Sequence, residues 1–168
     1  MIEPKVIEAG AKRVWVLGDL HFGVRANSQE WLAIQKQFFE ELFIPTLKKH
    51  VKPGDVLVQV GDTFDNRQSI NIKVLNYAVD LFERLGEILP VYVIVGNHDI
   101  WAKKTNEVSS IDTLKWIPNV QIYKDPELLK WSGRNILLMP WRRDTTHETE
   151  TLAEYPQSDV VFCHSEVK

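Results

Sequence analysis

Three short apolar segments of this sequence each end in a glycine that is followed by a side chain able to bind a metal ion. Apolar runs of four or five residues that stop at glycine indicate buried β-strands. In open α/β sheets, ligands bind where the parallel strands end. The pattern therefore predicts a sheet that gathers three polar side chains at one edge. The runs and the pairs that follow them are residues 14–17, 56–60 and 91–95, with Gly18-Asp19, Gly61-Asp62 and Gly96-Asn97.

Helical spacing separates these strands, so the chain alternates strand and helix. Asn27 and Glu30 form a capping signal, and a helix is expected to follow it. Pro45 is expected to kink or end that helix. The buried stripe of the helix is expected to contain Trp31, Ile34, Phe38 and Leu42.

A second helix is predicted between residues 70 and 85, with Gly86 as its C-cap. A short helix is expected over residues 110–116. Strands are expected at residues 120–123, 136–139 and 160–163. Alternating strands and helices predict an α/β fold.

The polar residues after the strands have the chemistry of a metal site. Asp19 and His21 are two residues apart, so in an extended segment both would point the same way and chelate one ion. Asp62 has two carboxylate oxygens and could bridge two ions, and Asn97 can offer its amide oxygen. His98 would then face the substrate.

This mixture of ligands suits Mn²⁺, Fe²⁺ or Zn²⁺ better than Ca²⁺. The absence of cysteine from the motifs argues against a structural zinc site. Two ions about 3.5–4 Å apart can clamp the attacking and leaving oxygens of a displacement at phosphorus. A single Gly-Asp pair is more often an ordinary turn, but three such motifs in order favour catalysis.

Composition limits the alternatives. The 168 residues are enough for one domain with its own core. Cys163 is the only cysteine, which excludes an internal disulfide and fits the cytoplasm, or a host's cytoplasm if the source is viral. No apolar stretch is long enough to predict a membrane span. The net charge of −3 gives no overall attraction to nucleic acid, so a DNA site would have to be a local basic patch.

The three motifs resemble the Asp-x-His, Gly-Asp-x-x-Asp and Gly-Asn-His-Asp signature of the calcineurin-like metallophosphoesterase superfamily. The resemblance covers residues 13–164 and is greatest to the SbcD-type DNA repair nucleases, through residues 18–24, 61–67 and 94–99. It implies a layered α/β sandwich in which mixed β-sheets are flanked by helices. It also implies one nuclease domain over residues 1–168.

The resemblance assigns a role to each motif residue. Asp19 and His21 would bind the first ion, and Asp62 would bind both ions. Asn97 and His164, which follows a later strand, would bind the second ion.

The resemblance also gives His98 a role, whereas the remaining candidates follow from their chemistry and from their positions in or beside the motifs. His98 would protonate the leaving 3′ oxygen or stabilise its charge. Asp65 and Asp99 would hold the metal ligands in position through hydrogen bonds. The candidates for contacts with DNA phosphates, which are otherwise ordinary solvated side chains, are Arg25, Arg67, Lys103 and Lys104.

The resemblance also implies cofactors and partners. The cofactors would be two divalent ions, manganese first, with magnesium, iron or zinc as alternatives. The partners would be DNA, an SbcC-like ATPase subunit and a second copy of the chain. The family's closing Gly-His-x-His motif is not among the 168 residues, so the nuclease domain is expected to be incomplete at its C-terminal side.

Three functions remain open from the sequence. The first is a Mn²⁺-dependent DNA exonuclease and endonuclease in recombination and double-strand-break repair. The second is a phosphatase or phosphodiesterase acting on another phosphoester. The third is a catalytically impaired chain that acts in assembly, which the missing closing motif favours.

Several other side chains carry weaker expectations. Trp101 could stack on a splayed base, whereas Trp31 and Trp116 are expected to pack in the core. The Trp141-Arg142-Arg143 segment could mark another contact with the DNA backbone, but a surface turn after a strand is the favoured expectation, and Cys163 is expected to be buried.

Overall fold

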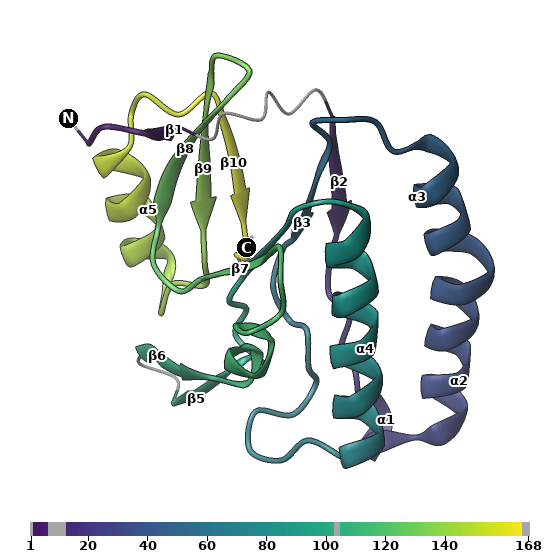
Figure 1. Ribbon diagram of the computed structural model, residues 1–168. Coiled ribbons are helices and arrows are strands. Elements are labelled where there is room, and N and C mark those ends of the chain that lie inside the picture. The colour runs from purple at the N-terminus through teal and green to yellow at the C-terminus, as the bar shows by residue number, and fades with distance from the viewer. Residues whose placement is uncertain (1, 7–12, 103–104, 166–168) are drawn as a thin grey trace.

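The computed structural model describes residues 2–6, 13–102 and 105–165 of the chain (Figure 1). The strands are β1 (Lys5–Val6), β2 (Val14–Leu17), β3 (Val56–Gln59), β4 (Val91–Ile94), β5 (Ile100–Ala102), β6 (Thr105–Ser109), β7 (Val120–Tyr123), β8 (Glu127–Trp131), β9 (Arg134–Met139) and β10 (Val160–Cys163). The helices are α1 (Val24–Asn27), α2 (Gln29–Gln37), α3 (Ile44–His50), α4 (Ile72–Ile88) and α5 (Thr145–Glu154). A π-helical segment (Phe38–Phe43) joins α2 to α3, and a 3₁₀ segment (Ser110–Leu114) follows β6.

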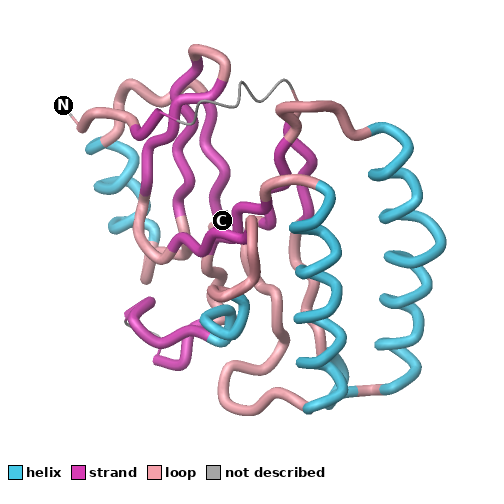
Figure 2. The backbone as a smooth tube through the Cα atoms, in the orientation of Figure 1, coloured by secondary structure: helices cyan, strands magenta, loops and turns pink. Residues whose placement is uncertain are grey.

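Two four-stranded sheets form the centre of the molecule. The first has the order β2-β3-β4-β7 with all neighbours parallel. The second has the order β1-β8-β9-β10, in which β8 and β9 are antiparallel and both outer pairs are parallel. The strands lie between α5 on one side and α2, α3 and α4 on the other (Figure 2). The layered α/β sandwich of mixed sheets and flanking helices is therefore confirmed.

Apolar side chains fill the spaces between these layers. Val58 and Ile94 of the first sheet pack with Trp131 and Leu138 of the second, and all four are buried. On the opposite face of the first sheet, the helices contribute a larger core that includes the buried Leu81. Burial on both faces explains why β4 and the first three residues of β3 are apolar.

Helix α4 continues through Gly86, so the prediction of a C-cap there was wrong. A Cβ atom at Gly86 would lie 2.5 Å from the carbonyl oxygen of Pro118. Asn119 donates a hydrogen bond from Nδ2 to the Gly86 oxygen, at 3.0 Å. Glycine is needed at this position because the helix passes against the turn that precedes β7.

The predicted buried stripe of α2 and the π-helical segment faces solvent instead. Ile34 and Leu42 are 54% and 59% exposed, whereas Leu32 and Phe39 are buried. Both sets have helical spacing, so periodicity alone did not decide which one faces the core. The helix begins at Gln29, and the capping side chain is Ser28 rather than Asn27.

The helix does not end at Pro45, because α3 continues to His50. Proline cannot donate a backbone hydrogen bond. The chain passes through the π-helical segment immediately before it, and such wider turns accommodate a local disruption of the helical ladder. Pro45 then lies in the first turn of α3, where the missing donor costs little.

Three side chains that were expected in the core are exposed. Trp116 is 82% exposed, and Trp31 and Cys163 are also at the surface. β10, which carries Cys163, is the last strand of its sheet, so it lacks a neighbour on one side. The described part of the chain has no helix that is both long and apolar enough to span a bilayer.

Candidate metal centre

The predicted ligands lie in the loops that follow β2, β3, β4 and β10. Because β2, β3 and β4 are parallel, their carboxyl ends reach the same edge of the sheet. β10 brings His164 from the second sheet to this edge. The His164 ring lies close to the loops after β3 and β4. Its Nδ1 is 2.9 Å from the carbonyl oxygen of Val60, and its Nε2 is 2.7 Å from Asn97 Oδ1.

Gly96 allows the loops after β3 and β4 to touch. A Cβ atom at this position would lie 2.2 Å from the Asp62 nitrogen and 2.3 Å from its Oδ1. No side chain can be accommodated at these distances, so any larger residue would push Asp62 away from the third motif.

Two groups of possible metal ligands share the buried side chain of Asp62. The first contains His21, Asp62 and His98, and the second contains Asp19, Asp62 and His164. Within each group, one ligand atom from every residue lies within 4.8 Å of the others. Asp62 Oδ2 is 3.6 Å from His21 Nε2, and Asp62 Oδ1 is 3.4 Å from His164 Nε2. The two oxygens of one carboxylate therefore face different groups.

The residues fit divalent cations. A carbonyl oxygen can only accept, so His164 donates from Nδ1 to Val60, and Nε2 is the ring atom that faces the other ligands. Nε2 lies 2.7 Å from Asn97 Oδ1 and 3.4 Å from Asp62 Oδ1. His21 Nδ1 is buried and has no hydrogen bond among the described residues, although it lies 3.5 Å from Asp65 Oδ1. Converging oxygen and imidazole acceptors are the donor set that transition-metal ions prefer.

Asp19 and His21 do not adopt the extended geometry expected from their spacing. Their φ angles are 44° and 45°, in the left-handed region. The His21 N–H donates to the Asp62 carbonyl oxygen at 2.9 Å, which fixes this loop against the loop after β3. As a result, Asp19 lies beside His164, and His21 lies beside His98. Backbone strain of this kind is concentrated at functional sites.

His98 is held on both sides by the second motif. Its backbone N–H donates to Asp62 Oδ1 at 2.8 Å. Its Nδ1 lies 2.7 Å from the carbonyl oxygen of Asp65 and must donate to it. Nε2 is consequently the ring atom available for chemistry. The His21 and His98 rings meet edge to face, with centroids 5.0 Å apart.

Asp99 lies behind the ligands and joins the second and third motifs. Its fully buried carboxyl accepts hydrogen bonds from the N–H groups of Gly96, at 2.9 Å, and Phe64, at 3.2 Å. Burial raises the pKa of Asp99 to about 7, although these two hydrogen bonds act in the opposite direction. Its contacts are those of a residue that positions both loops.

Gln59 has a similar role, which was not predicted from the sequence. This side chain is fully buried at the end of β3. Its Nε2 donates to the Gly61 oxygen at 2.6 Å, and its Oε1 accepts from the Gly61 N–H and the Thr63 hydroxyl, both at 3.2 Å. The signal was present, because a lone amide within an apolar strand must find buried partners.

The candidates for DNA contacts are dispersed. Arg67 and Trp101, which is 64% exposed, line one cavity of about 220 Å³ beside the third motif. Arg25 instead lies over the ring of Trp31, 5.1 Å from its centre. Lys103 and Lys104 lie outside the described residues.

Comparison with known proteins identifies the family of the chain. A sequence model of the family described as Calcineurin-like phosphoesterase matches residues 12–167. The chain is 31% identical over 150 residues to exonuclease subunit 1 of Enterobacteria phage T4, covering 88% of this chain and 43% of that protein. It is 34% identical over 86 residues to protein 078R of Invertebrate iridescent virus 3, covering 51% of this chain and 22% of that protein. The chain thus spans less than half the length of either relative.

Among solved structures, a protein of unknown function from Aquifex aeolicus, AQ665, has a similar fold. Its TM-score is 0.52 at 22% sequence identity, and the match covers 92% of this chain and 78% of that one.

Proposed function

Because this chain belongs to the calcineurin-like phosphoesterase family, we propose that it hydrolyses phosphodiester bonds of DNA with the help of two divalent metal ions. The observation that carries the proposal is the position of Asp62, whose two carboxylate oxygens face two separate groups of ligands. A carboxylate shared in this way is what a pair of closely spaced ions requires.

The ligand groups support a division of the residues between the two ions that differs from the sequence-based one in the place of Asp19. Asp62 would hold both ions, with His21 on one side and with Asp19 and His164 on the other. Asn97 would add its amide oxygen on the His164 side. When bound, such ions polarise the phosphoryl group and make water nucleophilic at neutral pH. The mixed oxygen and nitrogen ligands favour manganese, with magnesium, iron or zinc as alternatives.

His98 supplies the proton in this proposal. Its Nδ1 is occupied by the Asp65 carbonyl oxygen, so Nε2 is the ring atom that would meet the reacting groups. A protonated ring would give the Nε2 proton to the leaving 3′ oxygen. The hydrogen bond between the His98 N–H and Asp62 keeps the ring beside the ligands.

DNA is the substrate that the surroundings and the relatives favour. The similarity to a phage protein named as an exonuclease supports a nucleic acid substrate. The cavity shared by Arg67 and Trp101 places a cation and an exposed indole beside the third motif. Arginine binds phosphate, and exposed aromatic rings stack on unpaired bases.

The resemblance to SbcD-type nucleases extends the proposal to assembly. We propose that the chain acts in recombination and double-strand-break repair with an SbcC-like ATPase, and that two copies associate. The exposed apolar stripe of α2 supports an interaction surface, because large apolar patches on soluble proteins commonly mark such surfaces.

The test is cleavage of end-labelled single- and double-stranded DNA with Mn²⁺, in the wild type, His98→Ala and His50→Ala. His50 is an exposed histidine of α3 and serves as the matched control. We expect cleavage by the wild type and His50→Ala, a loss of at least a hundredfold in His98→Ala, and no cleavage in EDTA. Full activity of His98→Ala would contradict the assigned role.

Substrates tested side by side decide between the alternatives. Hydrolysis of p-nitrophenyl phosphate or a phosphopeptide without cleavage of DNA would assign the site to another phosphoester. A folded chain that hydrolyses none of these substrates would favour a role in assembly.

A further inference from the structure

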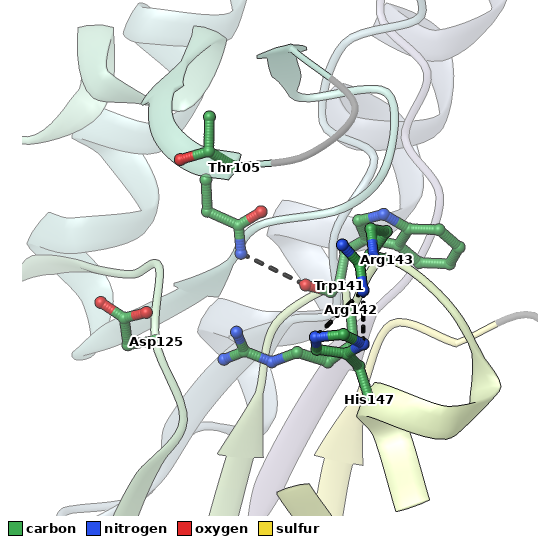
Figure 3. A pocket seen from close by; sticks show the side chains of 7 residues that line it. Thr105, Asp125, Trp141, Arg142, Arg143 and His147 are labelled. Carbon is green, nitrogen blue, oxygen red and sulfur yellow. Dashed lines mark hydrogen bonds between the residues drawn. The ribbon is translucent and has the colours of Figure 1, made fainter. Parts of the chain in front are cut away.

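A second polar cavity, separate from the ligand groups, lies between β6 and the loop that leads from β9 to α5 (Figure 3). It has a volume of about 250 Å³. Its lining includes Arg142, Arg143 and His147 on one side and Thr105 and Asp125 on the other. The cavity is large enough for a phosphate group together with water.

Arg142 is the unusual side chain of this cavity. It is half-buried, and its Nε and Nη2 atoms are fully buried without a hydrogen-bond partner among the residues that the structure describes. Burial also lowers the pKa of the guanidinium below its usual value. Buried donors on a charged group are costly when they are left unpaired, so such groups normally have a partner. Arg142 also lines the cavity, and a guanidinium matches the oxygens of a phosphate.

The neighbouring cation is held in place. Arg143 Nε is 3.1 Å from Asp144 Oδ2, and Arg143 Nη2 is 3.2 Å from His147 Nδ1. Asp144 also caps α5 by accepting the His147 N–H at 3.0 Å. Arg143 therefore borders the cavity while it forms a surface ion pair with Asp144.

The opposite wall carries a carboxylate whose charge acts on Arg142 and partly offsets the effect of burial on the pKa of the guanidinium. Asp125 faces the cavity from the turn between β7 and β8 (Figure 3). Among the ion pairs of the described residues, none joins Asp125 to Arg142. A bound anion would compete with Asp125 for the same guanidinium.

The cavity is joined to the metal centre through Trp141. The Trp141 ring meets the His164 ring with centroids 6.1 Å apart. The Trp141 N–H donates to the Val95 oxygen at 2.8 Å, and its own carbonyl oxygen accepts from Asn106 Nδ2 at 3.2 Å. These contacts fix the segment before Arg142 against both the third motif and β6. A group in the cavity would therefore lie one side chain away from a proposed metal ligand.

We propose that the Arg142 cavity binds a second, uncleaved phosphate of the substrate strand. The inference rests on the proposed action on DNA. It adds that the chain selects substrates with at least two phosphates, because the guanidinium of Arg142 would hold one while another lies at the metal centre. Holding a strand at two points orients the reacting phosphate.

The experiment measures binding without catalysis. A fluorescent single-stranded oligothymidylate is titrated in EDTA, and its anisotropy is followed at several salt concentrations. The variants are Arg142→Ala, Arg142→Lys, Asp125→Asn and Arg134→Ala. Arg134 is an exposed arginine at the opposite end of β9 and is the matched control. Circular dichroism verifies that each variant is folded.

We expect Arg142→Ala to bind about tenfold more weakly, as the loss of one charged hydrogen-bonding group predicts. The slope of log affinity against log salt should become less steep by about 0.7, the value for one phosphate contact on a single strand. The affinity of Arg142→Lys for the oligonucleotide should lie between those of the wild type and Arg142→Ala. Asp125→Asn should bind it more tightly than the wild type, and Arg134→Ala should match the wild type. Wild-type affinity and slope in Arg142→Ala would overturn the proposal.

A calorimetric titration with inorganic phosphate separates this inference from the proposed function. If the wild type does not bind the oligonucleotide but binds phosphate in an Arg142-dependent manner, the cavity binds free phosphate and not the phosphates of DNA. Absence of both kinds of binding would overturn the cavity proposal itself.

Discussion

Asp62 links the two ligand groups through a single side chain, and this predicts an unequal effect of carboxylate substitutions. Asp62→Asn removes the charge that both groups share, whereas Asp19→Asn removes a carboxylate from one group only. We expect Asp62→Asn to lower the affinity for Mn²⁺ at least tenfold at both sites. Asp19→Asn should lower it by that amount at one site only. Calorimetric titration with Mn²⁺ measures the stoichiometry, and two intact sites in Asp62→Asn would contradict the shared-ligand arrangement.

The turn after the first motif stores backbone strain that one substitution can release. Arg25, Ala26 and Asn27 have φ angles of 52°, 55° and 62°. A left-handed conformation costs about 1–2 kcal/mol for a residue with a Cβ atom, and glycine avoids this cost. We therefore expect Ala26→Gly to raise the free energy of unfolding by about 1 kcal/mol, or somewhat less because glycine gains entropy in the unfolded chain.

The matched control is Ala33→Gly, at an exposed position within α2. There the same change should lower the free energy of unfolding by about 0.5–1 kcal/mol. Urea unfolding measures both variants. A loss of stability in Ala26→Gly equal to that of the control would show that the left-handed turn is not strained.

At the scale of elements, a buried carboxylate joins β2, β3 and the end of α3. Asp55 accepts hydrogen bonds from the Arg13 guanidinium at 2.7 Å, the Lys52 N–H at 3.0 Å and the Trp15 indole at 3.3 Å. Arg13 also donates to the carbonyl oxygen of His50. Burial acts to raise the pKa of Asp55, but the hydrogen bonds from these donors lower it further, so the net pKa lies below its usual value.

This lowered pKa predicts a dependence of stability on pH. The folded state favours the carboxylate, so the contribution of Asp55 is fully present above the usual Asp pKa of about 3.9 and is lost as the pH falls below it. We expect Asp55→Asn to cost about 1–3 kcal/mol at pH 7, and the difference from the wild type to shrink below pH 4. Unfolding curves from pH 7 to pH 3 measure it.

Asp80→Asn is the control for that series, because Asp80 forms only a surface ion pair with Arg84. It should change the free energy of unfolding by less than about 1 kcal/mol at pH 7. A difference between the wild type and Asp55→Asn that stays constant down to pH 3 would contradict the assigned pKa direction.

The sequence predicted correctly those strands and helices whose pattern of apolar residues is contained within the element itself. The apolar runs of β3 and β4 and the glycines after them are such signals, and so is the helical spacing of α4. The choice between the two apolar stripes of α2 was not local, because it depends on how the preceding turn directs the helix. The antiparallel pair β5–β6 and strand β8 were not predicted at all.

The same distinction holds for the candidate site. The side chains named from the motifs do lie together, because parallel strands end at one edge. Which of them share a group was not predictable from spacing. That depends on the left-handed Asp19 and His21, whose loop is fixed by a hydrogen bond to Asp62. The metal roles of these residues stay predictions.

At the scale of the whole molecule, the exposed stripe of α2 and the π-helical segment predicts association of two copies. Trp31, Ile34, Phe38 and Leu42 present apolar surface on the outer side of the helical layer. Burying each large apolar side chain contributes about 1.5–3 kcal/mol. The double variant Ile34→Lys, Leu42→Lys should therefore weaken the dimer by much more than tenfold.

Sedimentation equilibrium over a range of protein concentrations measures the dimer. Ala33→Lys introduces the same charge at an exposed position beside the stripe and should leave the dimer intact. Lysine at positions 34 and 42 removes apolar surface without reaching the buried side of the helix, which Leu32 and Phe39 occupy. The double variant should therefore keep its fold and its DNA cleavage while becoming monomeric. A double variant that remains dimeric would assign the contact to another face, and a wild type that is monomeric throughout would exclude self-association through this stripe.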